Sequence, residues 1–207
     1  MKSEPWWTEQ LTQLHALSYN YDASEYVAGE PGWSVDHYEC NVPSELPGPP
    51  QPDGSFETAK RILIAYKFPD PGRIVGYYDE TADLAGRTML LEAKFLWMRF
   101  IFGVRVSNVI DEESPNGSGE LVTRYGYAYR TLEGHWEIGE MTYVVEKCAT
   151  TGEVRILIDA YSKFDRIPNW FHRLGFKLLG RSVQKQFAKS CLQRLREMVV
   201  AELDSSP

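Results

Sequence analysis

The stretch Thr123–Tyr143 constrains the fold of this chain more than any other part of its sequence. Two runs in which aromatic or apolar residues alternate with small or polar ones flank the pair Glu133–Gly134. Such alternation is typical of β-strands, and glycine adopts the positive φ of a tight turn without steric cost. The sequence therefore predicts a β-hairpin whose turn is Glu133–Gly134.

The length of the hairpin loop decides which side chains share a face of the sheet, because a shift of one residue moves a whole strand to the opposite face. With a loop of two or four residues, an aromatic face with a single carboxylate carries the candidate ligand-binding residues, which are Tyr125, Tyr127, Tyr129, Thr131, Trp136, Ile138 and Glu140. The opposite face is small and polar, and its candidate rim residues are Arg130, His135 and Glu137. In the two-residue case Arg130 lies opposite Glu137 in an ion pair worth ~0.2–1 kcal/mol. A three-residue loop would flip one of the two strands.

The elements around the hairpin are expected to form one domain over the 207 residues. A helical extension is expected over residues 1–30. Residues 33–164 are expected to form a strand and a helix, followed by about six antiparallel strands. Gly103 is expected to separate two of these strands. After Pro168 the apolar residues recur with a helical period, which predicts a C-terminal helix over 168–203, broken near Gly175–Gly180. This order is that of the α+β helix-grip (START/Bet v 1-like) fold, a curved antiparallel sheet wrapped around a long C-terminal helix.

The hairpin also carries a family resemblance. The pattern Tyr129-x-Thr131-Leu132-x-Gly134-His135-x-Glu137-x-Gly139-Glu140, followed by Ala160-x-Ser162 before the C-terminal helix, resembles uncharacterised protein family 0548. Upstream, Arg105-Val106 and Asp111-Glu112 resemble the same family, and the likeness covers roughly residues 56–200. This chain departs from the family pattern at Arg130, Glu133, Trp136, Met141 and Lys163. The resemblance implies the helix-grip fold and implies no particular activity.

Charge is unevenly distributed along the chain. The net charge is −7, but nine Lys and Arg against one Asp give residues 163–196 a charge of +8, which leaves −15 for the rest. An acidic body with a pI of about 5.2 is not typical of a nucleic-acid-binding protein. Basic residues spaced four apart predict a basic ridge on the C-terminal helix, formed by Arg173, Lys177, Arg181, Lys185 and Lys189. This ridge is either a solvated face or a surface that contacts anionic lipid or an acidic partner.

Several kinds of chemistry lack their sequence signatures. Cys40, Cys148 and Cys191 are odd in number and match no metal-ligand spacing, so we interpret them as reduced thiols of a cytoplasmic protein. The histidines form no metal-binding pattern, and no cofactor is expected. No serine lies in a nucleophile-elbow sequence, and the glycines fit neither a Rossmann nor a P-loop motif.

These observations favour a protein that binds a small, largely apolar molecule in a cavity between the sheet and the C-terminal helix. One alternative is an enzyme of the cyclase or hydratase type that uses the same cavity, with Glu140 as general acid. Another is an adaptor that meets a membrane surface or a protein through the basic ridge. Glu140 could also be a structural carboxylate bonded by a tyrosine, and His135 with Glu137 could be a solvated rim or an acid–base pair.

Overall fold

The computed structural model describes residues 5–95, 98–164 and 181–205. These residues form one seven-stranded sheet in the order β1-β7-β6-β5-β4-β3-β2, in which all neighbours are antiparallel. The strands are β1 (Ser34–Val42), β2 (Ile74–Tyr77), β3 (Thr88–Phe95), β4 (Met98–Pro115), β5 (Leu121–Thr131), β6 (Glu137–Cys148) and β7 (Val154–Phe164). The helices are α1 (Trp7–His15), the short 3-10 helix η1 (Ala23–Glu25), α2 (Ser55–Ala65) and α4 (Arg181–Ser205).

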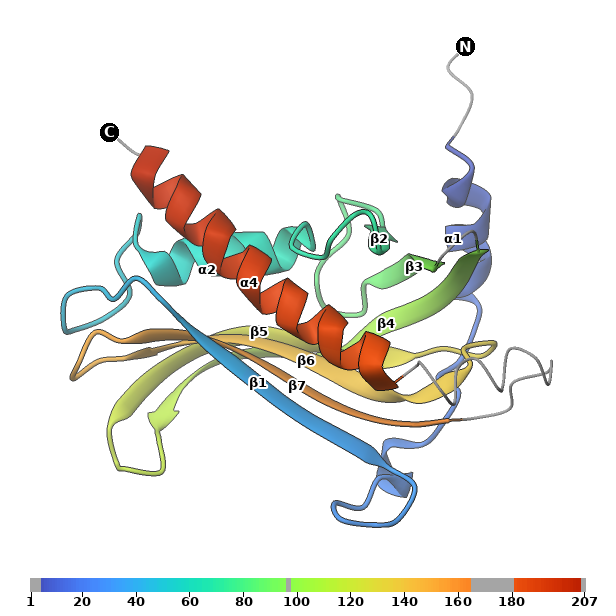
Figure 1. Ribbon diagram of the computed structural model, residues 1–207, viewed down its shortest axis with the longest axis horizontal. Helices are drawn as coiled ribbons and strands as arrows, with labels where there is room; N and C mark the ends of the chain where they lie inside the picture. The colour runs from blue at the N-terminus through green and yellow to red at the C-terminus, as the bar shows by residue number, and fades with distance from the viewer. Residues whose placement is uncertain (1–4, 96–97, 165–180, 206–207) are drawn as a thin grey trace.

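The sheet is strongly curved, and α2 and α4 lie on its concave side (Figure 1). This is the helix-grip fold that the order of elements predicts. The strand and helix before the hairpin, the strands β2 to β7 and the closing helix occur in the expected sequence. The predicted helix break near Gly175–Gly180 lies outside the described residues.

The core lies between the concave face and the two helices. One side of α4 contributes Phe187, Cys191 and Leu195, which are buried against the sheet and α2. Alternate residues of β7 meet them from the sheet, because successive strand residues point to opposite faces. Burying a side chain of this size is worth about 1.5–3 kcal/mol, so this packing is what holds α4 in the grip of the sheet.

The expected strand break at Gly103 is wrong, since β4 runs through this residue without interruption. The pairing of β3 with β4 extends from Thr88 opposite Arg105 to Phe95 opposite Met98. Gly103 serves packing, because a Cβ atom there would lie 2.6 Å from the side chain of Leu14. A side chain at this position would therefore force the Leu14 side chain to move from where it packs on the sheet.

Residues 5–26, here called the N-terminal arm, cross the convex face of the sheet on the side opposite α2 and α4 (Figure 1). Leu11 of α1 is buried, and Arg105 of β4 donates hydrogen bonds to the carbonyl oxygens of Leu14 (3.0 Å) and His15 (3.1 Å). Those carbonyls belong to the last turn of α1, where a cation is favourable. None of the described helices is long and apolar enough to cross a membrane.

Candidate ligand-binding site

The tight turn of the central hairpin lies where the sequence predicts it. Gly134 has a φ of +86°, and the amide of His135 donates to the carbonyl oxygen of Leu132 (3.1 Å). The strand pairing differs from the prediction, because Arg130 lies opposite Glu140 and not opposite Glu137. The predicted loop of two or four residues is therefore wrong. The pairing is displaced by three residues, and an odd displacement moves every side chain of β6 to the other face.

Tertiary contacts of the loop explain the displacement. Leu132 is fully buried, and its amide donates to the carbonyl oxygen of Gly103 (3.0 Å). Across the turn, the hydroxyl of Thr131 accepts a hydrogen bond from the amide of Gly139 (3.2 Å). This side-chain hydroxyl takes the position that a backbone carbonyl would have in a regular antiparallel ladder. A side chain at Gly139 would meet the neighbouring strand, since a Cβ atom there lies 2.3 Å from the carbonyl oxygen of Tyr161. Several residues of the motif thus shape the hairpin itself.

The displacement divides the predicted site between the two faces. The concave face carries Tyr125, Tyr127 and Tyr129 together with Met141 and Tyr143 of β6. Strand alternation places Arg130, Ile138 and Glu140 on the convex face. Thr131 is buried at the end of the hairpin, where its hydroxyl donates to the side-chain oxygen of Asn20 (2.6 Å). The expected arrangement of Glu140 among the tyrosines is therefore wrong.

Glu140 is held by polar neighbours beneath the N-terminal arm. The hydroxyl of Ser107 donates to its Oε2 atom (2.9 Å), and the Nε atom of Arg130 lies 3.7 Å from the same oxygen. The ring of Tyr19 stacks over the Arg130 guanidinium, 4.0 Å from the ring centroid. The side chain of Glu140 is 21% exposed and lies across the sheet from α4. In this position it cannot reach a molecule held between the sheet and α4.

The loop residues His135 and Trp136 form an aromatic group with β4. The ring of His135 lies 4.5 Å from that of Phe102, and Trp136 packs edge-on against Phe100 at 5.0 Å and Phe102 at 5.6 Å. The Nδ1 atom of His135 accepts from the amide of Glu137 (3.0 Å). Burial lowers the pKa of His135 to about 4, so the ring is neutral at physiological pH. The solvated rim expected here is replaced by a partly buried, neutral ring.

Four tyrosines meet under α4, and we call Tyr66, Tyr127, Tyr129 and Tyr143 the tyrosine cluster; each is at most 7% exposed. The hydroxyl of Tyr127 donates to the carbonyl oxygen of Leu63 (3.1 Å). The other three hydroxyls have poorer partners. Tyr129 and Tyr143 both donate to the thioether sulfur of Met141, at 3.5 and 2.8 Å, and lie 3.4 Å from each other.

Tyr66 is the least satisfied member of the cluster. Among the described residues its buried hydroxyl makes no hydrogen bond of normal geometry, although the Tyr129 hydroxyl lies near enough to interact with it. Its backbone is left-handed, with φ +47° and ψ +37°, and no other described residue except glycine has a positive φ. The ring fits only because residue 76 is glycine, since a Cβ atom there would lie 2.5 Å from it. No motif in the sequence marks Tyr66 as a site residue.

Burial keeps the cluster protonated. Desolvation, reinforced by the neighbouring hydroxyls, raises the pKa of Tyr66 and Tyr143 well above that of an exposed tyrosine. Desolvation likewise raises the pKa of Tyr129. The cluster therefore presents hydroxyl donors at physiological pH, and it contains no general base.

The basic ridge is only partly within the described residues. Lys185 and Lys189 are exposed on α4, the side chain of Arg181 is not described, and Arg173 and Lys177 lie outside the described ranges. Contact with an anionic membrane stays a prediction, to be tested with anionic vesicles at low salt.

Solved structures resemble this chain at low identity. A structure of TTHA0849 from Thermus thermophilus is 17% identical with a TM-score of 0.45, and the match covers 84% of this chain and 100% of that one. A point mutant of norcoclaurine synthase from Thalictrum flavum, in complex with a transition-state analogue, is 10% identical with a TM-score of 0.48 and coverages of 82% and 95%. The hypothetical protein jhp0584 from Helicobacter pylori is 14% identical with a TM-score of 0.48 and coverages of 89% and 95%.

Comparison of the sequence with known proteins and family models is more specific than these structural matches. No curated protein matches the chain significantly. A family model described as a domain of unknown function, DUF1990, matches residues 20–194, which include all seven strands, α2 and the tyrosine cluster. The match confirms the expected membership of an uncharacterised family: the chain belongs to the DUF1990 family.

Proposed function

We propose that this protein binds a small, largely apolar molecule with one hydrogen-bond-accepting oxygen, between the concave face of the sheet and helices α2 and α4. The observation that carries the proposal is the buried Tyr66 hydroxyl, which makes no hydrogen bond of normal geometry among the described residues. The oxygen of the bound molecule would accept from this hydroxyl.

The hydrogen bonding of the cluster supports a ligand with an acceptor. Tyr66, Tyr129 and Tyr143 offer three hydroxyl donors, and the acceptors that the described residues place among them are the thioether sulfur of Met141 and the tyrosine oxygens themselves, at a long 3.4 Å between Tyr129 and Tyr143. Sulfur of this kind is a weak acceptor, and a buried donor left without a partner costs about 1–3 kcal/mol. A carbonyl or ether oxygen brought in by a ligand would remove much of this cost.

The surroundings of the cluster favour an apolar body for the ligand. Phe68 packs edge-on against Tyr66 and Tyr143, with ring centroids 5.2 and 5.0 Å apart. Met141 is partly exposed, and its flexible side chain is the one that a ligand would most easily displace. A molecule that entered beside Met141 would place its oxygen at the hydroxyls and its apolar part among the aromatic rings.

Binding explains this geometry better than catalysis by Glu140, because the carboxylate lies on the opposite face of the sheet. The neutral hydroxyls of the cluster can orient a ligand, but they supply no group that would remove a proton at neutral pH.

The test compares two fluorescent probes of nearly equal size, 2-acetylnaphthalene and 2-ethylnaphthalene, which differ in one carbonyl oxygen. We expect the ketone to bind about tenfold more tightly to the wild-type protein, the factor for one buried hydrogen bond of ~1.4 kcal/mol. Tyr66→Phe should reduce this preference, and Tyr26→Phe, on the opposite side of the sheet, should leave it unchanged. Equal affinity of the two probes for the wild-type protein, or an unchanged preference in Tyr66→Phe, would refute the proposal.

A further inference from the structure

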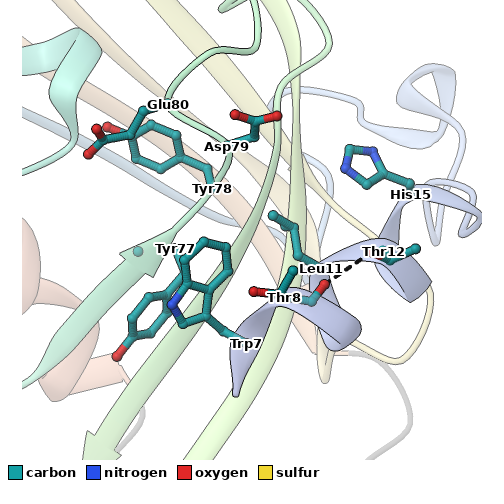
Figure 2. A pocket seen from close by; sticks show the side chains of 10 residues that line it. Trp7, Thr8, Leu11, Thr12, His15, Tyr77, Tyr78, Asp79 and Glu80 are labelled. Atoms are coloured by element: carbon teal, nitrogen blue, oxygen red, sulfur yellow. Dashed lines mark hydrogen bonds between the residues drawn. The ribbon is translucent and has the colours of Figure 1, made fainter. Parts of the chain in front are cut away.

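A pocket lies on the outer side of the edge strand β2, where α1 packs beside it (Figure 2). Its volume is about 480 Å³, and it is open to solvent on one side. Residues from two separate parts of the chain line it: Trp7, Thr8, Leu11, Thr12 and His15 from α1, and Gly76, Tyr77, Tyr78, Asp79 and Glu80 from β2 and the turn after it.

Aromatic rings form one wall of this pocket. Trp7 stacks on Tyr77 with ring centroids 5.7 Å apart and an interplanar angle of 24°, and Trp6 meets the same tyrosine edge-on at 5.3 Å. The hydroxyl of Tyr77 donates to the buried carboxylate of Glu92 (2.9 Å), which holds the ring in place. This hydrogen bond fixes the orientation of the Tyr77 ring, and Leu11 lies next to the wall at the centre of the pocket (Figure 2).

The opposite rim carries a carboxylate in a defined position. The Oδ1 atom of Asp79 accepts from the amide (2.9 Å) and the hydroxyl (2.7 Å) of Thr81. These hydrogen bonds orient the side chain and lower the pKa of Asp79, so the rim is anionic at physiological pH. His15 lies on the same side of the pocket as Asp79, and Trp7 lies at the other end (Figure 2).

The charge balance of the lining selects the kind of ligand. Among the lining residues that the structure describes, Asp79 and Glu80 are acids and none is Lys or Arg. The whole chain carries a net charge of −7, which adds to the attraction for cations. Aromatic faces attract cations through their negative quadrupole, and a carboxylate attracts them by charge.

We propose that the pocket between α1 and β2 binds a small organic cation with an apolar body, of the arylalkylamine class. The ammonium group lies at the Asp79 rim, and the apolar body packs on Leu11 and on the ring of Trp7. The site is independent of the proposed concave-face function, because it lies on the other side of the sheet.

The pocket combines the family domain with an addition to it. The family model matches residues 20–194, so β2 and Asp79 lie inside the match, whereas α1 lies outside it. All of the residues that α1 contributes, including Trp7 and Leu11, are therefore absent from the part of the chain that defines the family. The aromatic and apolar wall that α1 adds is therefore specific to the region outside the family match, whereas the Asp79 rim lies within it.

The test uses three isosteric probes that differ in charge: 2-phenylethylammonium, 2-phenylethanol and phenylacetate. Binding is followed by NMR, with the indole N–H signals of Trp6 and Trp7 as reporters beside the pocket. We expect saturable binding of the ammonium compound at least about fivefold tighter than that of the alcohol, and no binding of the carboxylate. Asp79→Asn, which keeps the size of the side chain, should remove the preference for the cation.

Asp53→Asn is the matched control, because Asp53 is exposed in the loop before α2 and lies outside the pocket. Asp53→Asn should retain the wild-type preference for the ammonium compound over the alcohol. Tyr66→Phe should retain it too, which distinguishes this pocket from the proposed ligand site on the concave face. Trp7→Leu should weaken binding of the ammonium compound and of the alcohol alike, since it removes one ring of the aromatic wall and leaves Asp79. Equal affinity for the ammonium compound and the alcohol, a preference that survives Asp79→Asn, or no saturable binding of any probe would overturn the proposal.

Discussion

Replacing Tyr66 by phenylalanine should stabilise the ligand-free protein, although the substitution removes a polar group from the core. Tyr66 is 4% exposed, and its hydroxyl makes no hydrogen bond of normal geometry among the described residues. Folding removes this hydroxyl from water without a compensating partner, at a cost of about 1–3 kcal/mol. The phenylalanine ring keeps the contacts with Phe68, Tyr129 and Tyr143, because these are made by the ring. We expect a gain of about 1 kcal/mol in the free energy of unfolding.

Tyr127→Phe is the matched control, since it removes a hydroxyl from the same cluster that does have a partner. The Tyr127 hydroxyl donates to the carbonyl oxygen of Leu63, which also accepts from the amide of Tyr66 and so keeps one hydrogen bond in the variant. We expect a loss of about 1 kcal/mol. For a domain of this length, 1 kcal/mol corresponds to about 2–4 °C in Tm, so the two variants should shift Tm in opposite directions.

Urea unfolding followed by tryptophan fluorescence measures both free energies. The free energies can be compared only if the wild-type protein and the two variants have equal m-values, since a changed m-value would indicate a change in the unfolded state or in the cooperativity of unfolding. If Tyr66→Phe lowers the free energy of unfolding by about 1 kcal/mol or more, the Tyr66 hydroxyl has a hydrogen-bond partner in solution. The central observation behind the proposed ligand site would then be wrong.

Two further predictions concern charged groups. Burial holds the pKa of His135 near 4 in the folded chain, against 6.5 in the unfolded chain, so the unfolded chain binds a proton first as the pH falls. The free energy of unfolding should fall by roughly 2–3 kcal/mol between pH 6.5 and pH 4, and His135→Gln should weaken this dependence in urea unfolding at several pH values. Lys147 and Glu45 form an ion pair of 2.7 Å with side chains 0% and 3% exposed, so Lys147→Met should cost about 3–5 kcal/mol in the same assay.

The elements of this fold could be predicted from local patterns because local residues determine them. Alternation in the strands, the helical period after Pro168 and the Glu133–Gly134 turn each depend on neighbours in sequence. The pairing of β5 with β6 could not be predicted in this way. It depends on the burial of Leu132 beside Gly103 and on the bond between Thr131 and Gly139, which no alternation pattern records.

The same distinction explains which site residues were missed. Tyr66 becomes a site residue through its left-handed backbone at the end of α2 and through the space that Gly76 leaves for its ring. The two residues belong to different elements, so neither is informative alone. Gly103 likewise suggests a strand break until the approach of Leu14 is known. In each case the glycine permits contact between parts of the chain that are distant in sequence.

The displaced pairing also determines how the two proposed sites must be tested. It places the tyrosines under α4 and leaves Arg130 and Glu140 on the convex face, beneath the N-terminal arm. The N-terminal arm therefore lines the pocket between α1 and β2, and it also shields charged and apolar groups of the sheet from solvent. Deleting it would remove Trp7, but it would also deprive Arg105 of the carbonyl acceptors of α1, so lost binding could reflect a damaged fold. Asp79→Asn avoids this ambiguity, because it changes the charge at the rim and leaves the packing of α1 on the sheet untouched.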